Sequence, residues 1–345
     1  MRRPFLSIGL VALAVNVGSA QQTGGPPRSE VASVRPVQAA IIELEFGRLT
    51  ISVSDSWTAQ VFHIVDQLAE WDTSSHQAYR RWARTNLRLD TEDRQLLQKH
   101  AEMRRARGWG NGFEQAFHVD YSIEAAAARA VDQKLLSAEE AASEQTILLH
   151  FAPKLVALRD QHQQQIEAFK ARLFAERSRL SPWFDKLVRF SETKTTVKVP
   201  VFLVANAEEG SGGGGADGGQ IVVEVPAPSP MGVLFHESLH ILLAPHLDEI
   251  KAAAESAGMR SGNLNEGIVY AMAPGLTDNP AEVDSLAEQV ARFLQHGTPA
   301  SNNYAESYMI ATVIRPVLRA SIDAGETFPL FLPKAVAEWR SFMPR

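Results

Sequence analysis

The spacing of apolar positions changes several times along the chain, and each change predicts a different element. Residues 44–53 alternate between apolar and polar side chains, which predicts a strand or a small hairpin that breaks near Gly47. Large apolar residues then recur at helical spacing, with Asp55 in front of them as a possible N-cap. This pattern predicts a helix with one buried face, formed by Trp57, Val61, Ile64, Leu68 and Trp71.

Long helices are predicted for the middle of the chain. Ser137 and Glu140 form a capping-box pattern, which marks a helix start. From position 151 to position 179, apolar residues at helical spacing alternate with Gln, Arg and Glu, so we expect a long amphipathic helix. Ser181 and Pro182 are typical of a new start, and a shorter helix is predicted behind them.

β-branched residues replace the helical pattern at 195–207 and again at 220–225, and both stretches are predicted strands. The glycine-rich tract 210–219 lies between them. It lacks the Gly-Lys-Ser/Thr ending of a phosphate-binding loop, so we interpret it as a hairpin tip. Helical patterns then return, at 230–244, 264–273, 280–296, 303–323 and 334–342.

Together these elements predict an α+β fold that is predominantly helical and contains a small antiparallel or mixed sheet. Residues 39–190 form the expected helical N-terminal region. Residues 191–345 form the expected second domain, which carries most of the sheet.

The start of the chain is typical of a protein for export. In residues 1–20, two arginines precede a short apolar stretch, and small residues at its end suit cleavage after Ala20. The apolar stretch is too short to span a bilayer comfortably, so we expect no stable membrane insertion. Residues 21–38 are rich in Gly, Pro and Gln and form the expected flexible leader. The predicted location is therefore secreted or periplasmic.

The composition of the chain excludes some kinds of functional site and argues against one class of partner. The chain has no cysteine, which excludes disulfides, thiolate metal ligands and cysteine nucleophiles. Its net charge is −6 and it has no basic run, which argues against nucleic acid as the main partner.

The stretch MGVLFHESLHILLAPH, residues 231–246, places polar chemistry in apolar surroundings. His236 and His240 are four residues apart and share a helix face, so both rings can reach one ion. Glu237 lies one step around the helix, close enough to touch a water at that ion. Two buried histidines hydrogen-bonded within a helix bundle are the alternative, but such groups are costly among apolar neighbours unless a cation compensates them. The pattern therefore predicts a metal site with a carboxylate beside it as a base.

Two alternative residues can supply a third ligand, and each corresponds to a different sequence pattern, or register, of zinc peptidases. His246 follows His240 at the metzincin spacing, and Met272 would be its Met-turn, but Leu243 stands where that pattern has a turn-forming glycine. In the other register, Glu266 lies in the first turns of the next predicted helix. A carboxylate from that facing helix would complete a His, His, Glu set and leave one position for water.

The motif HESLH followed by Asn265-Glu266-Gly267 resembles the gluzincin metallopeptidases, which combine HExxH with a later NEG. The resemblance covers about residues 195–325 and is specific in these two short motifs. It implies a zincin-like metallopeptidase domain over 191–345 and a peptide or protein substrate.

By the same resemblance, Zn²⁺ is held by His236, His240 and Glu266, and Glu237 is the general base. Many gluzincins carry an Asp four residues after the ligand Glu to orient a ligand histidine, whereas this chain has Tyr270. The partner of the ligand histidines is therefore unassigned at this level.

Peptide hydrolysis also needs a donor for the developing oxyanion. Related enzymes often use a Tyr or His from a later helix, and Tyr304 and Tyr308 lie four apart on one predicted face. Packing with their hydroxyls at the surface is the alternative for both. An extended substrate is expected to pair with residues 199–207 as an edge strand.

The N-terminal region has no comparable constellation. Residues 107–118 set aromatics among glycines, which either line a groove or pack as a loop against a helix. The histidines of this half are scattered singly and predicted to be surface or packed residues: His63, His76, His100, His118, His150 and His162. A secreted protein that keeps the zinc helix for binding or structure, without catalysis, is the alternative function.

Overall fold

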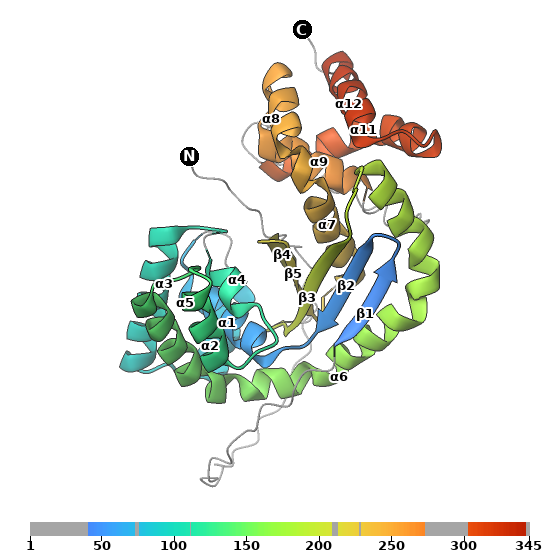
Figure 1. The fold of residues 1–345 in the computed structure, drawn as a ribbon. Helices are drawn as coiled ribbons and strands as arrows, with labels where there is room; N and C mark the ends of the chain where they lie inside the picture. Colours follow the sequence, from blue (N-terminus) through green and yellow to red (C-terminus); the bar gives the residue numbers. More distant parts are fainter. Residues whose placement is uncertain are drawn as a thin grey trace, which may run out of the picture.

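A computed structural model describes residues 41–72, 76–110, 112–208, 213–227, 229–272 and 303–342. The predicted signal and leader and the helix predicted at 280–296 lie outside these residues. Within them the fold is predominantly helical with one small mixed sheet, which confirms the α+β class (Figure 1). None of the helices in the described ranges is long and apolar enough to cross a membrane.

The sheet has the strand order β1-β2-β3-β5-β4. β1 and β2 form the predicted antiparallel hairpin, with Gly47 at a φ of 58° in its turn. β3 pairs in parallel with β2 on one side and with β5 on the other, and β4 is antiparallel to β5. The bounds are β1 Ile42–Phe46, β2 Leu49–Ser54, β3 Val197–Ala205, β4 Gly214–Asp217 and β5 Gln220–Val225.

Two strand predictions need correction. Residues 199–207 were expected at an edge, but β3 lies in the middle of the sheet because both of its sides are paired. The glycine-rich tract was expected only as a tip, yet residues 214–217 of that tract form β4, the last strand of the sheet. The free edge nearest the histidine motif is therefore β4.

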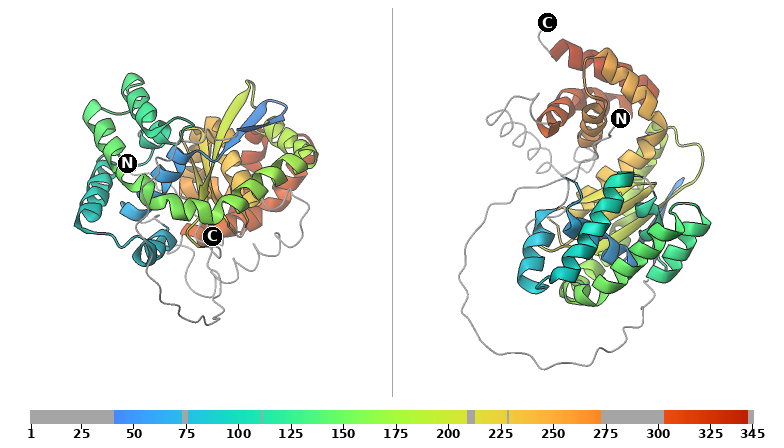
Figure 2. Two further views of the ribbon diagram at one scale, coloured as in Figure 1. Left: turned by 90° about the horizontal axis from the view of Figure 1, so that it is seen from below. Right: turned by 90° about the vertical axis from the view of Figure 1, so that its left-hand side faces the viewer.

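The helices form two groups joined by one long helix (Figures 1 and 2). α6 is that long helix, and it runs along the sheet from one group to the other. The front helices are α1 Trp57–Ala69, α2 Gln77–Asn86, α3 Thr91–Arg107, α4 Phe113–Phe117 and α5 Ile123–Asp132, and α6 is Ala138–Phe190. The back helices are α7 Pro230–Leu243, α8 Leu247–Ser256, α9 Ser261–Met272, α11 Asn303–Asp323 and α12 Phe328–Phe342, with a short 3-10 turn at Ala244–His246. α9 and α12 begin earlier than predicted.

The capping box of Ser137 and Glu140 is present at the start of α6, as predicted. α1 is capped by Ser56, so the prediction of Asp55 as its cap is wrong. The prediction of a new helix at Ser181-Pro182 is also wrong, because α6 continues through this proline. Proline removes one backbone hydrogen bond from a helix, but burial of the side chains directly after it holds the helix together here.

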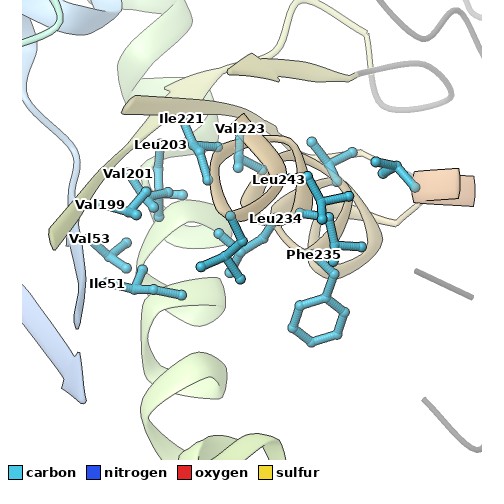
Figure 3. Close-up of a cluster of buried hydrophobic side chains, with 14 of the residues drawn as sticks. Ile51, Val53, Val199, Val201, Leu203, Ile221, Val223, Leu234, Phe235 and Leu243 are labelled. Atoms are coloured by element: carbon cyan, nitrogen blue, oxygen red, sulfur yellow. The ribbon is translucent and has the colours of Figure 1, made fainter. Parts of the chain in front are cut away.

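Both faces of the sheet are covered. On one face, alternate residues of β2, β3 and β5 pack with Leu234, Phe235 and Leu243 of α7 (Figure 3). On the other face, Phe202 and Val222 meet Ala59 of α1. Because β1 and β2 come from the N-terminal half and β3 to β5 from the C-terminal half, one sheet joins the two predicted regions.

Candidate metal centre

The histidine motif lies on α7, which begins where Ser229 accepts a hydrogen bond from the Gly232 N–H at 3.3 Å. Pro230 occupies the first turn, where its missing N–H costs nothing. The apolar residues of the helix are buried against the sheet, and this fixes its rotation. That rotation directs His236 and His240 toward α9.

Three side chains converge between α7 and α9. The Nε2 atoms of His236 and His240 are 3.1 Å apart. Oε2 of Glu266 lies 3.3 Å from Nε2 of His236, and Oε1 lies 3.3 Å from Nε2 of His240. Ligand atoms of all three residues lie within 4.8 Å of one another. The described residues thus bring the predicted His, His, Glu set together, and its donor types suit a catalytic zinc site.

The electrostatics of this cluster favour a cation. Burial opposes ionisation of Glu266, but the charges and hydrogen bonds of His240 and His236 hold its pKa well below its usual range. Burial likewise opposes the charge of His240, and the Glu266 carboxylate raises the pKa of that imidazole. Glu266 is thus a buried carboxylate that stays ionised and stabilises positive charge on the adjacent imidazoles. A metal ion between these side chains would supply the same positive charge.

Glu237 lies beside the three candidate ligands and is buried. Burial raises the pKa of Glu237, and the backbone N–H of Ala216 hydrogen-bonds its carboxylate. Ala216 belongs to β4, where it is paired with Ile221. Strand β4 thus holds the carboxylate that the sequence predicts as general base.

The register of β4 shows which backbone groups remain for a ligand. The Glu224 N–H donates to Gly213 O at 2.9 Å, so every second residue from Gly213 bonds to β5. Gly214 and Ala216 are the intervening residues, and their N–H and C=O groups point to the free edge. One of these outward groups, the Ala216 N–H, binds Glu237.

Asn265 supplies the partner that the sequence left unassigned. Nδ2 of Asn265 lies 3.2 Å from Nδ1 of His240. Oδ1 of Asn265 is buried and has no hydrogen-bond partner among the described residues. A half-turn of the amide exchanges the two atoms, and Oδ1 then accepts Nδ1–H of His240. That arrangement leaves Nε2 of His240 free to bind a metal.

The other candidates of the sequence analysis have different surroundings. His246 is turned away from the motif: its Nδ1 lies 3.1 Å from Glu249, and its Nε2 lies 3.0 Å from the carbonyl oxygen of Ser191. Its ring also packs on Phe328, with centroids 4.8 Å apart. The described groups that could hold a metal do not include His246.

Tyr270 stands where many gluzincins have Asp, and its ring packs on His236 with centroids 4.7 Å apart. Tyr308 of α11 packs on Tyr270 in turn, at 4.5 Å, and hydrogen-bonds to it. Burial, and to a smaller extent the charge of Glu266, raise the pKa of Tyr308, so its hydroxyl keeps its proton. Position 304 also lies on α11, but the Tyr304 side chain falls outside the described part of the chain.

A pocket opens beside the candidate metal ligands and extends to the front helices. Its lining includes Glu237, His240 and Glu266 on one side and Trp109, Glu114 and His118 on the other. Both interpretations of residues 107–118 hold in part: Trp109, Glu114 and His118 line the pocket, whereas Phe113 and Phe117 are packed in the core. Sequence reasoning gave Glu114 and His118 no chemical role in this pocket, and it did not single out Asp217 of β4. Neither their spacing nor a motif marks them, because strand pairing and helix packing bring them together.

Two histidines expected to be isolated share one carboxylate. Nε2 of His63 lies 3.0 Å from Glu224, and Nδ1 of His76 lies 3.3 Å from it. The second Glu224 oxygen also accepts the Gly213 N–H at 2.8 Å. Burial opposes the charge of Glu224, but these two histidines hold its pKa well below the usual range. The cluster fastens α1 and the start of α2 to β5.

Comparison with models of protein families, with curated proteins and with solved structures found no match to this chain.

Proposed function

We propose that this protein is an exported, zinc-dependent metallopeptidase of the gluzincin type, with a zincin-like catalytic domain. The observation that carries the proposal is the convergence of His236, His240 and Glu266, with ligand atoms within 4.8 Å, beside a buried Glu237. Two imidazoles and one carboxylate are the ligand set of several zinc hydrolases.

The chemistry divides between the ion and the chain. A bound zinc ion supplies Lewis acidity, which acidifies water and polarises a carbonyl. His236, His240 and Glu266 hold the ion, and Asn265 orients His240. Glu237 takes a proton from water and delivers it to the leaving amine. Burial raises the pKa of Glu237 and so makes it a stronger base than an exposed carboxylate.

The substrate peptide is proposed to lie along β4. The outward backbone groups of Gly214 can pair with an extended peptide, as in other strand-addition complexes. Ala216 connects this binding edge directly to Glu237. Tyr304 or Tyr308 of α11 is the proposed donor to the developing oxyanion.

The test begins with the purified mature chain. Metal analysis is expected to find about one zinc ion per chain, as for a mononuclear catalytic site. Hydrolysis of a peptide library should be lost on chelation and restored by zinc. Glu237→Gln should keep the zinc and lower kcat/KM by roughly 10²- to 10⁴-fold, the usual contribution of a general base. Glu255→Gln, at an exposed position of α8, is the matched control.

The outcome also separates the alternatives. Glu266→Ala should lose zinc whereas His246→Ala should retain it, and the reverse result would support the metzincin register. Full activity of Glu237→Gln would remove this residue from the role of base. Stoichiometric zinc without hydrolysis of any peptide would favour a secreted zinc-containing binding or structural protein.

A further inference from the structure

Two carboxyl groups face each other in the pocket beyond the metal ligands. Glu114 of α4 is only 2% exposed, and its Oε2 is buried with no hydrogen-bond partner among the described residues. Asp217 of β4 is close enough to Glu114 for a hydrogen bond when one of the two is protonated. Its Oδ2 accepts the Gly110 N–H at 3.0 Å, which fixes the side chain. Both residues line the pocket.

Negative charge exceeds positive charge around this pair. Arg104 forms ion pairs with Glu114 and with Asp66, at 2.7 Å from the latter. Arg104 is therefore shared between two carboxylates, and Asp217 remains as a third. Among the described residues that line the pocket, five are Asp or Glu and none is Lys or Arg. His118 adds no positive charge, because burial lowers its pKa to about 3.

The pKa values of both carboxyl groups are raised in these surroundings. Burial raises the pKa of Glu114 to about 7 in spite of Arg104, and the neighbouring Asp217 adds to the rise. Burial also raises the pKa of Asp217. A ligand cation between the two groups would replace the proton and remove the cost of burying their charge.

The pair also lies next to the proposed reaction centre. Ala216 holds Glu237 through its backbone N–H, and Asp217 is the next residue of β4. Glu114 and Asp217 line the same pocket as Glu237, His240 and Glu266. Asp217 is paired with Gln220, on the sheet face that α1 and α4 cover, where Phe62 and Trp109 offer apolar surface to a side chain.

We propose that Glu114 and Asp217 bind a positively charged group of the substrate, an ammonium or a guanidinium, close to the scissile bond. This inference rests on the proposed peptidase function. The group belongs either to a Lys or Arg side chain or to the N-terminal amine of the peptide.

The experiment compares fluorogenic peptides that differ at one charge. One series places Lys or Gln at each position flanking the scissile bond, and a second series has a free or an acetylated N-terminus. We expect kcat/KM of the cationic peptide to exceed that of its neutral partner by roughly tenfold or more, as for a charge-assisted hydrogen bond in a buried site. The series that shows the preference identifies the source of the cation.

Variants connect the preference to the pair. In Asp217→Asn the ratio of the two kcat/KM values should fall close to one, and Glu114→Gln should have the same effect if thermal unfolding shows that it is folded. Asp160→Asn, an exposed position of α6 outside the pocket, should keep the wild-type ratio. A ratio that Asp217→Asn leaves unchanged, or a wild-type preference for neutral or acidic peptides, would overturn the inference.

A binding measurement separates this inference from the proposed function. Titration of zinc-loaded Glu237→Gln with the same cationic peptide should quench or enhance tryptophan fluorescence, since Trp109 lines the pocket. Adding Asp217→Asn should weaken that binding by roughly tenfold. If no peptide is hydrolysed but this binding is observed, the peptidase function fails and the cation site stands. If peptides are hydrolysed without preference and bound without dependence on Asp217, only the cation site fails.

Discussion

At the scale of single residues, Asn265 contacts His240, one of the three candidate metal ligands, without belonging to that set itself. Its amide lies 3.2 Å from Nδ1 of His240, directly before Glu266 in the chain. An imidazole binds a metal through one nitrogen only when its other nitrogen carries the proton, and an acceptor at that second nitrogen fixes this tautomer. We therefore expect Asn265 to act as a positioning residue for His240.

Removing this acceptor should weaken the metal site without removing a ligand. Asn265→Ala is expected to lower zinc affinity by roughly 10- to 100-fold, the usual cost of losing such a partner. Asn265→Asp should retain tight binding, because a carboxylate is an equally good acceptor. The dissociation constant for zinc, measured by competition with a chelating dye, checks both. Asn263→Ala is the control, since Asn263 lies on the same helix but bonds Glu306 instead. Equal zinc affinity in Asn265→Ala and wild type would contradict the role.

At the scale of elements, β4 depends on a glycine at its contact with α7. A Cβ on Gly214 would lie 2.2 Å from the carbonyl oxygen of Val222 and 2.5 Å from Cγ1 of Val233. A Cβ on Gly215 would meet nothing within 4 Å. The two neighbouring glycines thus have different reasons to be present: one permits close packing of strand on helix, and the other keeps the pocket open.

These neighbours provide a matched pair of variants. Gly214→Ala should lower the free energy of unfolding by about 1–3 kcal/mol, because a methyl group is forced into a filled space. It should also lower kcat/KM, since displacement of β4 moves Ala216 away from Glu237. Gly215→Ala should unfold at nearly the wild-type denaturant concentration. Equilibrium unfolding of both variants, followed by circular dichroism, checks the difference, and equal midpoints would show that β4 does not pack closely on α7.

The same elements show which features the sequence could predict. The α7 motif depends on residues four apart in one helix, so its face and its two histidines follow from local periodicity. The boundaries of β4 and the centre position of β3 depend on pairing between strands that are distant in sequence, and glycines carry no side-chain pattern. Glu114 and Asp217 are about 100 residues apart, and only the packing of α4 on the sheet brings them into one pocket. For the third ligand the sequence offered His246 and Glu266, the resemblance favoured Glu266, and the geometry of α9 brings Glu266 to the two histidines.

At the scale of the whole molecule, buried charges tie the front helices to one another behind the pocket. His100 of α3 lies 3.0 Å from Asp66 of α1 and 2.9 Å from Glu144 of α6. Arg104, one turn further along α3, connects Asp66 to Glu114 of α4. Four helices are thus held by a single chain of ion pairs, and its end at Glu114 is a wall of the pocket. The stability of this half of the molecule and the shape of the pocket therefore depend on the same buried groups.

This network makes stability sensitive to alkaline pH. Burial opposes the charge of His100, but Glu144 and Asp66 raise its pKa from 6.5 to about 9. Because the folded protein binds this proton more tightly than the unfolded chain, the contribution is complete below pH 6.5 and is lost as the pH rises through about 9. We expect the free energy of unfolding to fall by at most about 3 kcal/mol over that range. Chemical unfolding at several pH values measures this decrease in the free energy of unfolding.

Two histidine variants test the source of the pH dependence. His100→Gln should be less stable than wild type at pH 6.5, and its free energy of unfolding should decrease less as the pH rises. His150→Gln should show the wild-type decrease, because His100 is still present. An undiminished fall in His100→Gln would mean that this histidine does not hold the proton on which the network depends.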